Sequence, residues 1–598
     1  MAVEEKIAQA IRLAIQAASG EEVPEETIVL QKTRKDFEGD VTFVVFPFLK
    51  LLKRSPEESA GFLGKEVISR VEEVDSFNVV KGFLNISLKK SFWLDFLLTQ
   101  SGSQDYGKAA TISADKPVIV EYSSPNTNKP LHLGHIRNNL LGNSVARILE
   151  ASGKQVVKVN LVNDRGIHIC KSMLAWIKYG QGETPETSGK KGDKLVGDYY
   201  VRFETELRKQ VQEVMNSRAI TEEEARNTAP LMLEARDLLR KWEERDPEVI
   251  RVWEIMNTWV YRGFDSTYTR LGIDFDKIYY ESDTYLLGRT IVLEGLKEGR
   301  LIKKADGSVW ADLSDDNLDE KLLLRTDGTS VYITQDIGTA QLRHDEFKPE
   351  KMLYVVGNEQ NYHFEVLKKV LKKLGKSWAD TIHHLSYGMV ELPDGKMKSR
   401  EGTVVDADDL MDEMVETARR TTEELGKTTD FSETYKAVLY HTIAMGALKY
   451  FILKVDPRKN MLFNPAESID FNGNTGPFIQ YTHARIASMI RKAGPERMAQ
   501  LRTDIHKHQI HPKEIALLKH IYNYPGMVRE AAGELNPALI ANFTYELCKE
   551  FNQFYHEFPV LNEPDRHISD FRLQLSAFTA LCIRNAMELL GINVPERM

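Results

Sequence analysis

The stretch Val118-Ile-Val-Glu-Tyr-Ser-Ser-Pro-Asn-Thr-Asn-Lys-Pro-Leu-His-Leu-Gly-His135 joins an apolar, strand-like run to the start of a helix. The apolar run, 118–122, is followed by a polar loop and then by a predicted helix over about 135–151. A second apolar run, 156–162, comes next. Strand, loop, helix and strand in this order are typical of a βαβ unit in a parallel sheet. Ligands of such sheets bind beyond the carboxyl ends of the strands.

The rest of the chain extends this pattern in both directions. Further strands are predicted at 351–356 and near 382–390, whereas 180–262 is rich in Glu, Arg and Lys at helical spacing and is predicted to be a helical insertion. We therefore expect a multidomain α/β plus all-α protein. Its predicted parts are an N-terminal α+β domain at 1–105, a Rossmann-type parallel-sheet catalytic domain at 116–407, a helical connector at 408–450 and a C-terminal helical bundle at 451–598.

Composition excludes several classes of protein. The formal charge of −9 does not indicate a general polyanion partner such as DNA. Three widely spaced cysteines, Cys170, Cys548 and Cys582, cannot form a disulfide framework or a cysteine-based zinc site. The apolar run 437–453 contains Lys449 and is short for a bilayer, so we expect a buried helix there. A soluble, cytoplasmic protein with no tightly bound metal follows as an expectation.

The histidines of the opening stretch are the first candidate catalytic residues. His132 and His135 are three apart at the start of the predicted helix, with Gly134 between them and Lys129 just ahead. Imidazoles at a helix N-terminus can donate hydrogen bonds to phosphate oxygens, and the helix dipole favours the negative charge. This arrangement suits attack of a carboxylate on the α-phosphate of ATP. The two histidines alone could equally cap the helix and bind no ligand.

His132-Leu-Gly-His135 resembles the His-Ile-Gly-His signature of class I aminoacyl-tRNA synthetases. Their second signature, Lys-Met-Ser-Lys-Ser, is most similar to Lys396-Met397-Lys398-Ser399-Arg400, in which serine replaces the second lysine. Arginyl enzymes commonly lack that lysine and carry one ahead of the first signature, where this chain has Lys129. The resemblance implies that ATP, accompanied by Mg²⁺, contacts Lys129, His132, Gly134, His135, Lys396 and Met397.

The resemblance extends to an arginine pocket. A guanidinium requires carboxylates placed for paired hydrogen bonds, and Tyr332 and Asp336 lie four apart, on one face of a helix. They resemble the tyrosine and aspartate of the arginyl-specific segment. Any single acidic residue is more often a surface charge, so the order of the whole set carries the assignment. The other residues that match the family at this pocket are Glu121, Asn126, Glu281 and Gln360.

Contacts with tRNA are also implied by the family. Phe478 and Tyr481, three apart, could stack on unpaired bases, although both could instead be core aromatics. Phe83 and Asn85 resemble an N-terminal element that meets the outer corner, or D-loop side, of tRNA. The terminal Met598 resembles the usual chain end near the anticodon loop.

These features identify the chain as a member of the arginyl-tRNA synthetases. The expected reaction activates L-arginine with ATP and transfers it to tRNA(Arg), releasing AMP and diphosphate, in a monomer without membrane association. Two alternatives remain from the residues: a non-catalytic tRNA-binding paralogue, and a class I synthetase for another amino acid. A small adenylyl transferase is disfavoured by the long helical C-terminus.

Overall fold

The computed structural model describes residues 2–34, 36–113, 115–218, 220–391, 405–424, 426, 430–501 and 510–598. They form two compact units. Unit 1 consists of Met1–Tyr106, Arg485–Pro525 and Glu546–Ile583, and unit 2 consists of Gly107–Ala484, Gly526–Tyr545 and Arg584–Met598. The N-terminal residues thus group with two segments of the C-terminal region, an association that patterns along the chain do not reveal.

A five-stranded parallel sheet forms the centre of unit 2, as predicted from the βαβ pattern. Its spatial order is β12-β11-β5-β6-β7, and the strands are β5 (Val118–Glu121), β6 (Val156–Val162), β7 (Lys277–Tyr280), β11 (Lys351–Gly357) and β12 (Ile382–Tyr387). The first strand lies in the middle, and later strands are added on either side of it. The switch point between β5 and β11 is where such sheets bind ligands.

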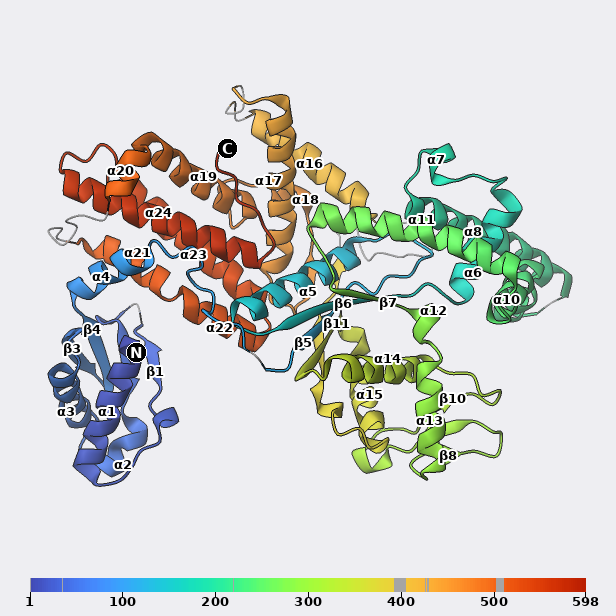
Figure 1. Ribbon diagram of the computed structural model, residues 1–598, viewed down its shortest axis with the longest axis horizontal. Helices are drawn as coiled ribbons and strands as arrows, with labels where there is room; N and C mark the ends of the chain where they lie inside the picture. The colour runs from blue at the N-terminus through green and yellow to red at the C-terminus, as the bar shows by residue number, and fades with distance from the viewer. Residues whose placement is uncertain are drawn as a thin grey trace. The chain divides into compact units, whose positions relative to one another are not determined.

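Helices cover both faces of this sheet (Figure 1). One face packs against α5 (Leu133–Ala151), where Gly142 allows the close approach: a Cβ there would lie 2.4 Å from Tyr122. The other face carries the main hydrophobic core, in which Ile119 and Met352 of the sheet pack with residues of three helices. Those helices are α13 (Leu287–Lys297), α14 (Tyr332–Phe347) and α15 (Asn361–Lys373).

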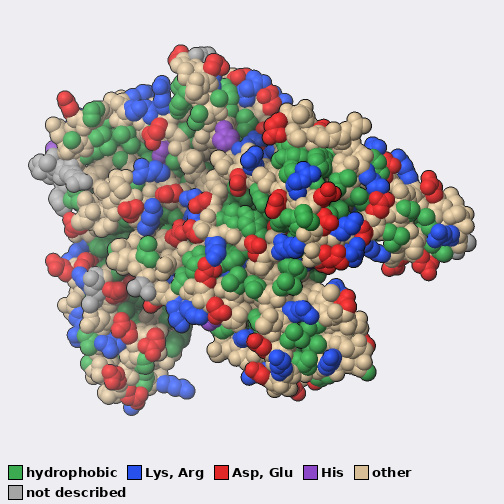
Figure 2. All heavy atoms as spheres, turned by 45° about the vertical axis from the view of Figure 1, so that its right-hand side comes forward, with side chains coloured by type: hydrophobic (Ala, Val, Ile, Leu, Met, Phe, Trp, Pro, Cys, Tyr) green, Lys and Arg blue, Asp and Glu red, His purple; other side chains and the backbone are tan. Residues whose placement is uncertain are grey.

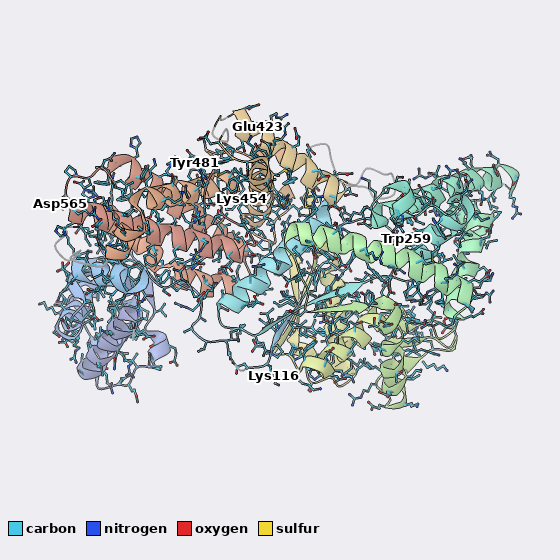
Figure 3. All side chains as sticks on the ribbon, turned by 45° about the horizontal axis from the view of Figure 1, so that its top comes forward. Lys116, Trp259, Glu423, Lys454, Tyr481 and Asp565 are labelled. Carbon is cyan, nitrogen blue, oxygen red and sulfur yellow. The ribbon has the colours of Figure 1, made fainter. Side chains whose placement is uncertain are left out.

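Two further pieces are inserted between strands of the sheet. Between β6 and β7 the chain is helical from Ile167 to Leu271, a longer stretch than the predicted insertion at 180–262. Its helices are α6 (Ile167–Tyr179), α7 (Pro185–Ser188), α8 (Gly192–Arg218), α9 (Glu222–Thr228), α10 (Pro230–Glu243) and α11 (Pro247–Leu271). Trp259 of α11, labelled in Figure 3, packs edge-on against Trp176 of α6.

The second inserted piece, which patterns in the sequence did not predict, is a small antiparallel sheet between α13 and α14. It consists of β8 (Ile302–Lys303), β9 (Val309–Ala311) and β10 (Lys321–Leu324). Its strands are short and carry little apolar alternation, so no pattern in the sequence indicates them.

The chain after the sheet is mostly helical, as predicted, and also contains the short strand β14 (Met461–Leu462), which pairs in parallel with β13 (Val390–Glu391). It contains α16 (Ala407–Glu424), α17 (Glu433–Leu453), α18 (Pro465–Ser468), α19 (Gly476–Ala493), α20 (Pro495–Gln500), α21 (Pro512–Tyr522), α22 (Tyr524–Glu534), α23 (Pro537–Glu557) and α24 (Arg566–Leu589). The apolar run at 437–453 lies in α17 and is largely buried. Among the described residues, no helix is long and apolar enough to cross a membrane.

Unit 1 contains a four-stranded antiparallel sheet of order β1-β2-β4-β3, formed by β1 (Leu30–Lys32), β2 (Val41–Val44), β3 (Val74–Val80) and β4 (Phe83–Leu88). The helices of its N-terminal segment are α1 (Val3–Ser19), α2 (Leu49–Leu52), α3 (Pro56–Arg70) and α4 (Lys90–Gln100). Figure 2 shows Lys and Arg side chains interspersed with Asp and Glu on the face that it draws. Because this face has no uniformly positive or negative patch, we locate the binding site from cavities instead.

Candidate active site

The chain turns sharply where β5 ends. Ser123 and Ser124 have φ values of 77° and 45°, which are uncommon for residues with a side chain. The turn is held by two buried amides: Ser123 N donates to Asn138 Oδ1 of α5 at 2.5 Å, and Ser124 N donates to Asn160 Oδ1 of β6 at 3.0 Å. Backbone held in this way concentrates at functional sites, and here it lies between two cavities.

The first cavity, which we call the histidine cavity, has a volume of about 480 Å³. It lies beyond the carboxyl ends of β5 and β11, at the switch point of the sheet. Four of the residues expected to contact ATP line it together: Lys129, His132, Gly134 and His135.

The two histidines are oriented by backbone amides. Gly134 N donates to His132 Nδ1 at 3.1 Å, and His132 N donates to His135 Nδ1 at 3.2 Å. Because each Nδ1 accepts a hydrogen bond, each neutral ring carries its proton on Nε2. The rings lie 3.9 Å apart between centroids. The histidines therefore cap α5 and also present Nε2–H donors, so the two interpretations of the sequence are not exclusive.

Both imidazoles are uncharged at neutral pH. Burial, assisted by Lys129, lowers the pKa of His132 to about 3. Burial, then His132 and Lys129, hold the pKa of His135 well below its ordinary value. The cavity thus supplies neutral hydrogen-bond donors, and its positive charge comes from Lys129.

Lys129 carries that charge without an acidic partner. Burial lowers the pKa of its ammonium group, and among the described residues no carboxylate forms an ion pair with it. An incoming anion can supply the missing counter-charge.

The described residues on either side of the second signature are Glu391 and Val405. Glu391 lines the cavity, and Val405 O accepts from Leu133 N at 3.3 Å. Lys396 and Met397 themselves lie outside the described residues.

The second cavity, which we call the acidic cavity, has a volume of about 970 Å³ and shares Ser124 and Val356 with the first. All six residues expected to bind arginine line it: Glu121, Asn126, Glu281, Tyr332, Asp336 and Gln360. Residues up to 239 positions apart in the sequence thus lie at one site.

Ion pairs within the acidic cavity distinguish its carboxylates. Glu121 is buried and pairs with the buried guanidinium of Arg343, and its other oxygen accepts from Ser124 Oγ at 3.0 Å. Glu243 pairs with Arg165 at 3.0 Å. Glu281 lies 3.8 Å from the same Arg165, so that contact is loose.

Unlike Glu121 and Glu243, the described Glu281 and Asp336 have no close ion pair with an arginine. The pKa of Glu281 is raised to about 7, chiefly by burial, while Arg165 opposes the rise and Asp164 and Asp336 add to it. Asp336 accepts from, or shares a proton with, His363 Nε2 at 2.7 Å.

Helix α14 presents the site residues at helical spacing. Tyr332, Asp336 and Arg343 all line the cavity, and Tyr332 begins the helix with 81% of its surface exposed. Sequence reasoning missed Arg343 and His363. Arg343 lies seven residues after Asp336 on the same face, and His363 lies three after Gln360, so helical spacing from predicted residues could have indicated both.

The residues expected to contact tRNA occupy different environments. In unit 1, Asn85 is 1% exposed, and its amide bonds to Thr42 at 2.7 Å and Asn78 at 2.9 Å, so in this structure it serves the sheet. Phe83 packs edge-on against Phe46. The role of both in tRNA binding stays a prediction.

In unit 2, Phe478 and Tyr481 lie half-buried on α19, where Figure 3 labels Tyr481, and Phe478 contacts the ring of Tyr545 at 5.5 Å. The C-terminal segment ending at Met598 is held by side chains that donate to its carbonyls. The donors are Gln480 to Asn593 O at 2.8 Å, His483 to Pro595 O at 3.1 Å and Tyr435 to Arg597 O at 3.0 Å.

Comparison with known families accounts for nearly the whole chain. Residues 97–464 match the catalytic domain of class I tRNA synthetases (R), and residues 479–598 match the DALR anticodon binding domain. These matches fit the parallel-sheet and helical parts of the structure.

Similar proteins agree with this division. Arginine–tRNA ligases of Bacteroides thetaiotaomicron and Phocaeicola vulgatus are each 54% identical, with all of both chains covered. The arginyl-tRNA synthetase of Thermus thermophilus is 26% identical, with a TM-score of 0.78 and 99% of each chain covered. That of Plasmodium falciparum, at 20% identity, shares the fold with a TM-score of 0.75 over 99% of each chain. The chain belongs to the arginyl-tRNA synthetase family.

Proposed function

We propose that the two cavities divide the arginyl-tRNA ligase reaction between them. The histidine cavity takes the phosphates of ATP, and the acidic cavity takes the side chain of arginine. The observation that supports this division is that both cavities meet at Ser124 and Val356. An arginine held in one cavity can therefore present its carboxylate to the α-phosphate held in the other.

The chemistry requires donors where charge develops. As the arginine carboxylate attacks the α-phosphorus, negative charge builds on the phosphoryl oxygens and on the departing diphosphate. The Nε2–H groups of His132 and His135 are fixed by their Nδ1 bonds and need no reorganisation to donate. Lys129 adds a full positive charge, and we propose that Lys396 does the same from the neighbouring segment.

Guanidinium recognition falls to Glu281 and Asp336. Both line the acidic cavity, and neither is tightly paired with a cation, whereas Glu121 already neutralises Arg343. Glu121 is then free to act through its remaining lone pairs near the ammonium group of the substrate. A site built around paired carboxylates rejects side chains that lack the fork by a large factor, on the order of 10⁴.

The remaining partners follow from the family. We propose that Mg²⁺ enters with ATP, whose phosphates supply its ligands, because no cluster of three His, Cys, Asp or Glu side chains occurs among the described residues. We also propose that the substrate is tRNA(Arg), bound through the C-terminal helices, and that the enzyme acts as a cytoplasmic monomer. The three free, buried cysteines fit a reducing compartment.

The test is arginine-dependent exchange of diphosphate into ATP, and charging of tRNA, with wild-type protein and Asp336→Asn. We expect the substitution to raise the KM for arginine by about 100-fold, since a charge-assisted hydrogen bond to the substrate is lost, and to leave the KM for ATP nearly unchanged. An unchanged KM for arginine would remove Asp336 from the pocket. Exchange without tRNA, measured in parallel, tests whether tRNA is required for activation.

A further inference from the structure

Asp336 is held differently from the other carboxylates of the acidic cavity. Glu121 and Glu243 each pair with an arginine. Among the described residues, the one side chain that bonds to Asp336 is His363, through Nε2 at 2.7 Å. An arginine or lysine in that place would neutralise Asp336 and would compete with a cationic substrate. A neutral imidazole donates one N–H and leaves the carboxylate charged.

The imidazole of His363 is itself fixed in place. His363 belongs to the first turn of α15, directly after the 3₁₀ turn η4 (Asn358–Gln360). Its ring meets Phe364 edge-on at 5.6 Å, and Phe364 stacks on His384 at 4.4 Å. His384 Nε2 in turn bonds to Val356 O at 2.9 Å. The ring thus rests on a chain of contacts that ends in β11.

The hydrogen bond sets the direction of the carboxylate. The bond from His363 of α15 to Oδ2 restricts rotation of the carboxylate of Asp336 on α14, and Asp336 lines the cavity. A guanidinium fork gains from a fixed carboxylate because its donors are planar and rigid. A carboxylate free to rotate would lose orientational entropy when arginine binds.

We propose that His363 is a positioning residue for arginine recognition: it orients the carboxylate of Asp336 through its Nε2 hydrogen bond. This inference rests on the proposed role of Asp336 as a guanidinium partner. His363 lines the acidic cavity and not the histidine cavity, so it affects the binding of arginine and not the transfer of the adenylyl group.

A matched pair of substitutions tests this role. His363→Gln keeps an N–H donor at the end of a side chain of similar length, whereas His363→Met has that length without a donor. We expect His363→Met to raise the KM for arginine about 10-fold with kcat within about 2-fold. His363→Gln should stay within about 3-fold of wild type. If the methionine variant does not fold, His363→Ala replaces it in the same comparison. Equal KM values for the glutamine and donor-free variants would overturn the proposal.

Two further measurements separate this inference from its premise. In the Asp336→Asn background, His363→Met should cause no further rise in KM, because a positioning residue has nothing left to orient; an additive rise overturns the proposal. If Asp336→Asn itself leaves the KM unchanged, the proposed function of Asp336 fails instead. His344→Met is the control, since His344 lies on α14 but stacks on Trp378 at 4.7 Å, outside the acidic cavity.

Discussion

Glu281 is a residue of the acidic cavity whose charge changes near neutral pH. Burial raises its pKa to about 7, so the protein without arginine protonates it as the pH falls through that value. The protonated carboxyl cannot form an ion pair with the substrate. Between pH 8 and pH 6 the KM for arginine should therefore rise about 10-fold, measured by diphosphate exchange.

The same measurement on Glu281→Gln provides the control. That variant should show a KM raised about 10- to 100-fold and a flatter dependence on pH. A wild-type KM that does not change between pH 6 and pH 8 would exclude Glu281 as the titrating group.

A substitution of Lys129 tests the proposed role of the histidine cavity. Under the proposed function Lys129 brings positive charge to the phosphates of ATP, so Lys129→Ala should lower kcat for activation about 100-fold. Because Lys129 forms no ion pair with a described carboxylate, the substitution should not lower Tm. Lys154→Ala is the control, because Lys154 pairs with Glu350 near the amino end of the sheet. Full activity of Lys129→Ala would contradict its assignment.

The positions of single residues show how much of the site could be predicted from the sequence. His132, Asp336 and the other described residues predicted to bind ATP or arginine do line the two cavities, whereas the residues predicted to contact tRNA do not. The pairing of Glu121 with Arg343 could not be predicted, because it joins residues 222 positions apart across a sheet whose packing no local pattern specifies. Helical spacing could have indicated His363 as a lining residue, but not its contact with Asp336, which joins two helices.

At the scale of elements, prediction succeeded where the apolar pattern was long. The strand at 156–162 matches β6, and 118–122 overlaps β5. The edge strand β7 was missed, since Lys277–Tyr280 is short, polar at its start and preceded by the long helical insertion Ile167–Leu271. Its placement beside β6 is a tertiary effect.

The crossing of α13 and α14 is an element-scale feature with a direct consequence for arginine. A Cβ on Gly288 of α13 would lie 1.6 Å from the carbonyl oxygen of Thr334 in α14. Thr334 lies one helical turn before Gly338, which is also close to Gly288. Gly288→Ala must push α14 away, which should cost about 1–3 kcal/mol of stability. It should also raise the KM for arginine at least about 10-fold, because α14 carries Asp336.

Thermal unfolding and diphosphate exchange measure both effects. Gly533→Ala in α22 is the matched control, since a Cβ there meets nothing within 4 Å and should stabilise the helix by about 0.5–1 kcal/mol. A Gly288→Ala variant with wild-type Tm and KM would show that α13 and α14 separate without cost.

At the scale of the whole molecule, the chain matches two family domains, and each of its two compact units consists of separate segments of the sequence. Residues 584–598 belong to unit 2, although they lie more than a hundred positions after the end of the matched catalytic domain. Ser144 of α5, three turns beyond the histidines, donates to Leu589 O at 2.8 Å. The end of the chain is therefore part of the packing around the catalytic helix, which composition and periodicity alone do not indicate.

The C-terminal segment provides the last prediction. Its carbonyls at Asn593, Pro595 and Arg597 are bonded by side chains of α17 and α19, the latter carrying Phe478 and Tyr481. Deleting 593–598 should raise the KM for tRNA at least about 5-fold, the loss expected from one or more base contacts, while the KM values for arginine and ATP change less than about 2-fold. Tyr435→Phe, which removes one bond to the segment but no residue of it, should have a much smaller effect in the same charging assay. If the deletion leaves the KM for tRNA unchanged, Met598 and its neighbours do not bind tRNA, and the segment only completes the packing of unit 2.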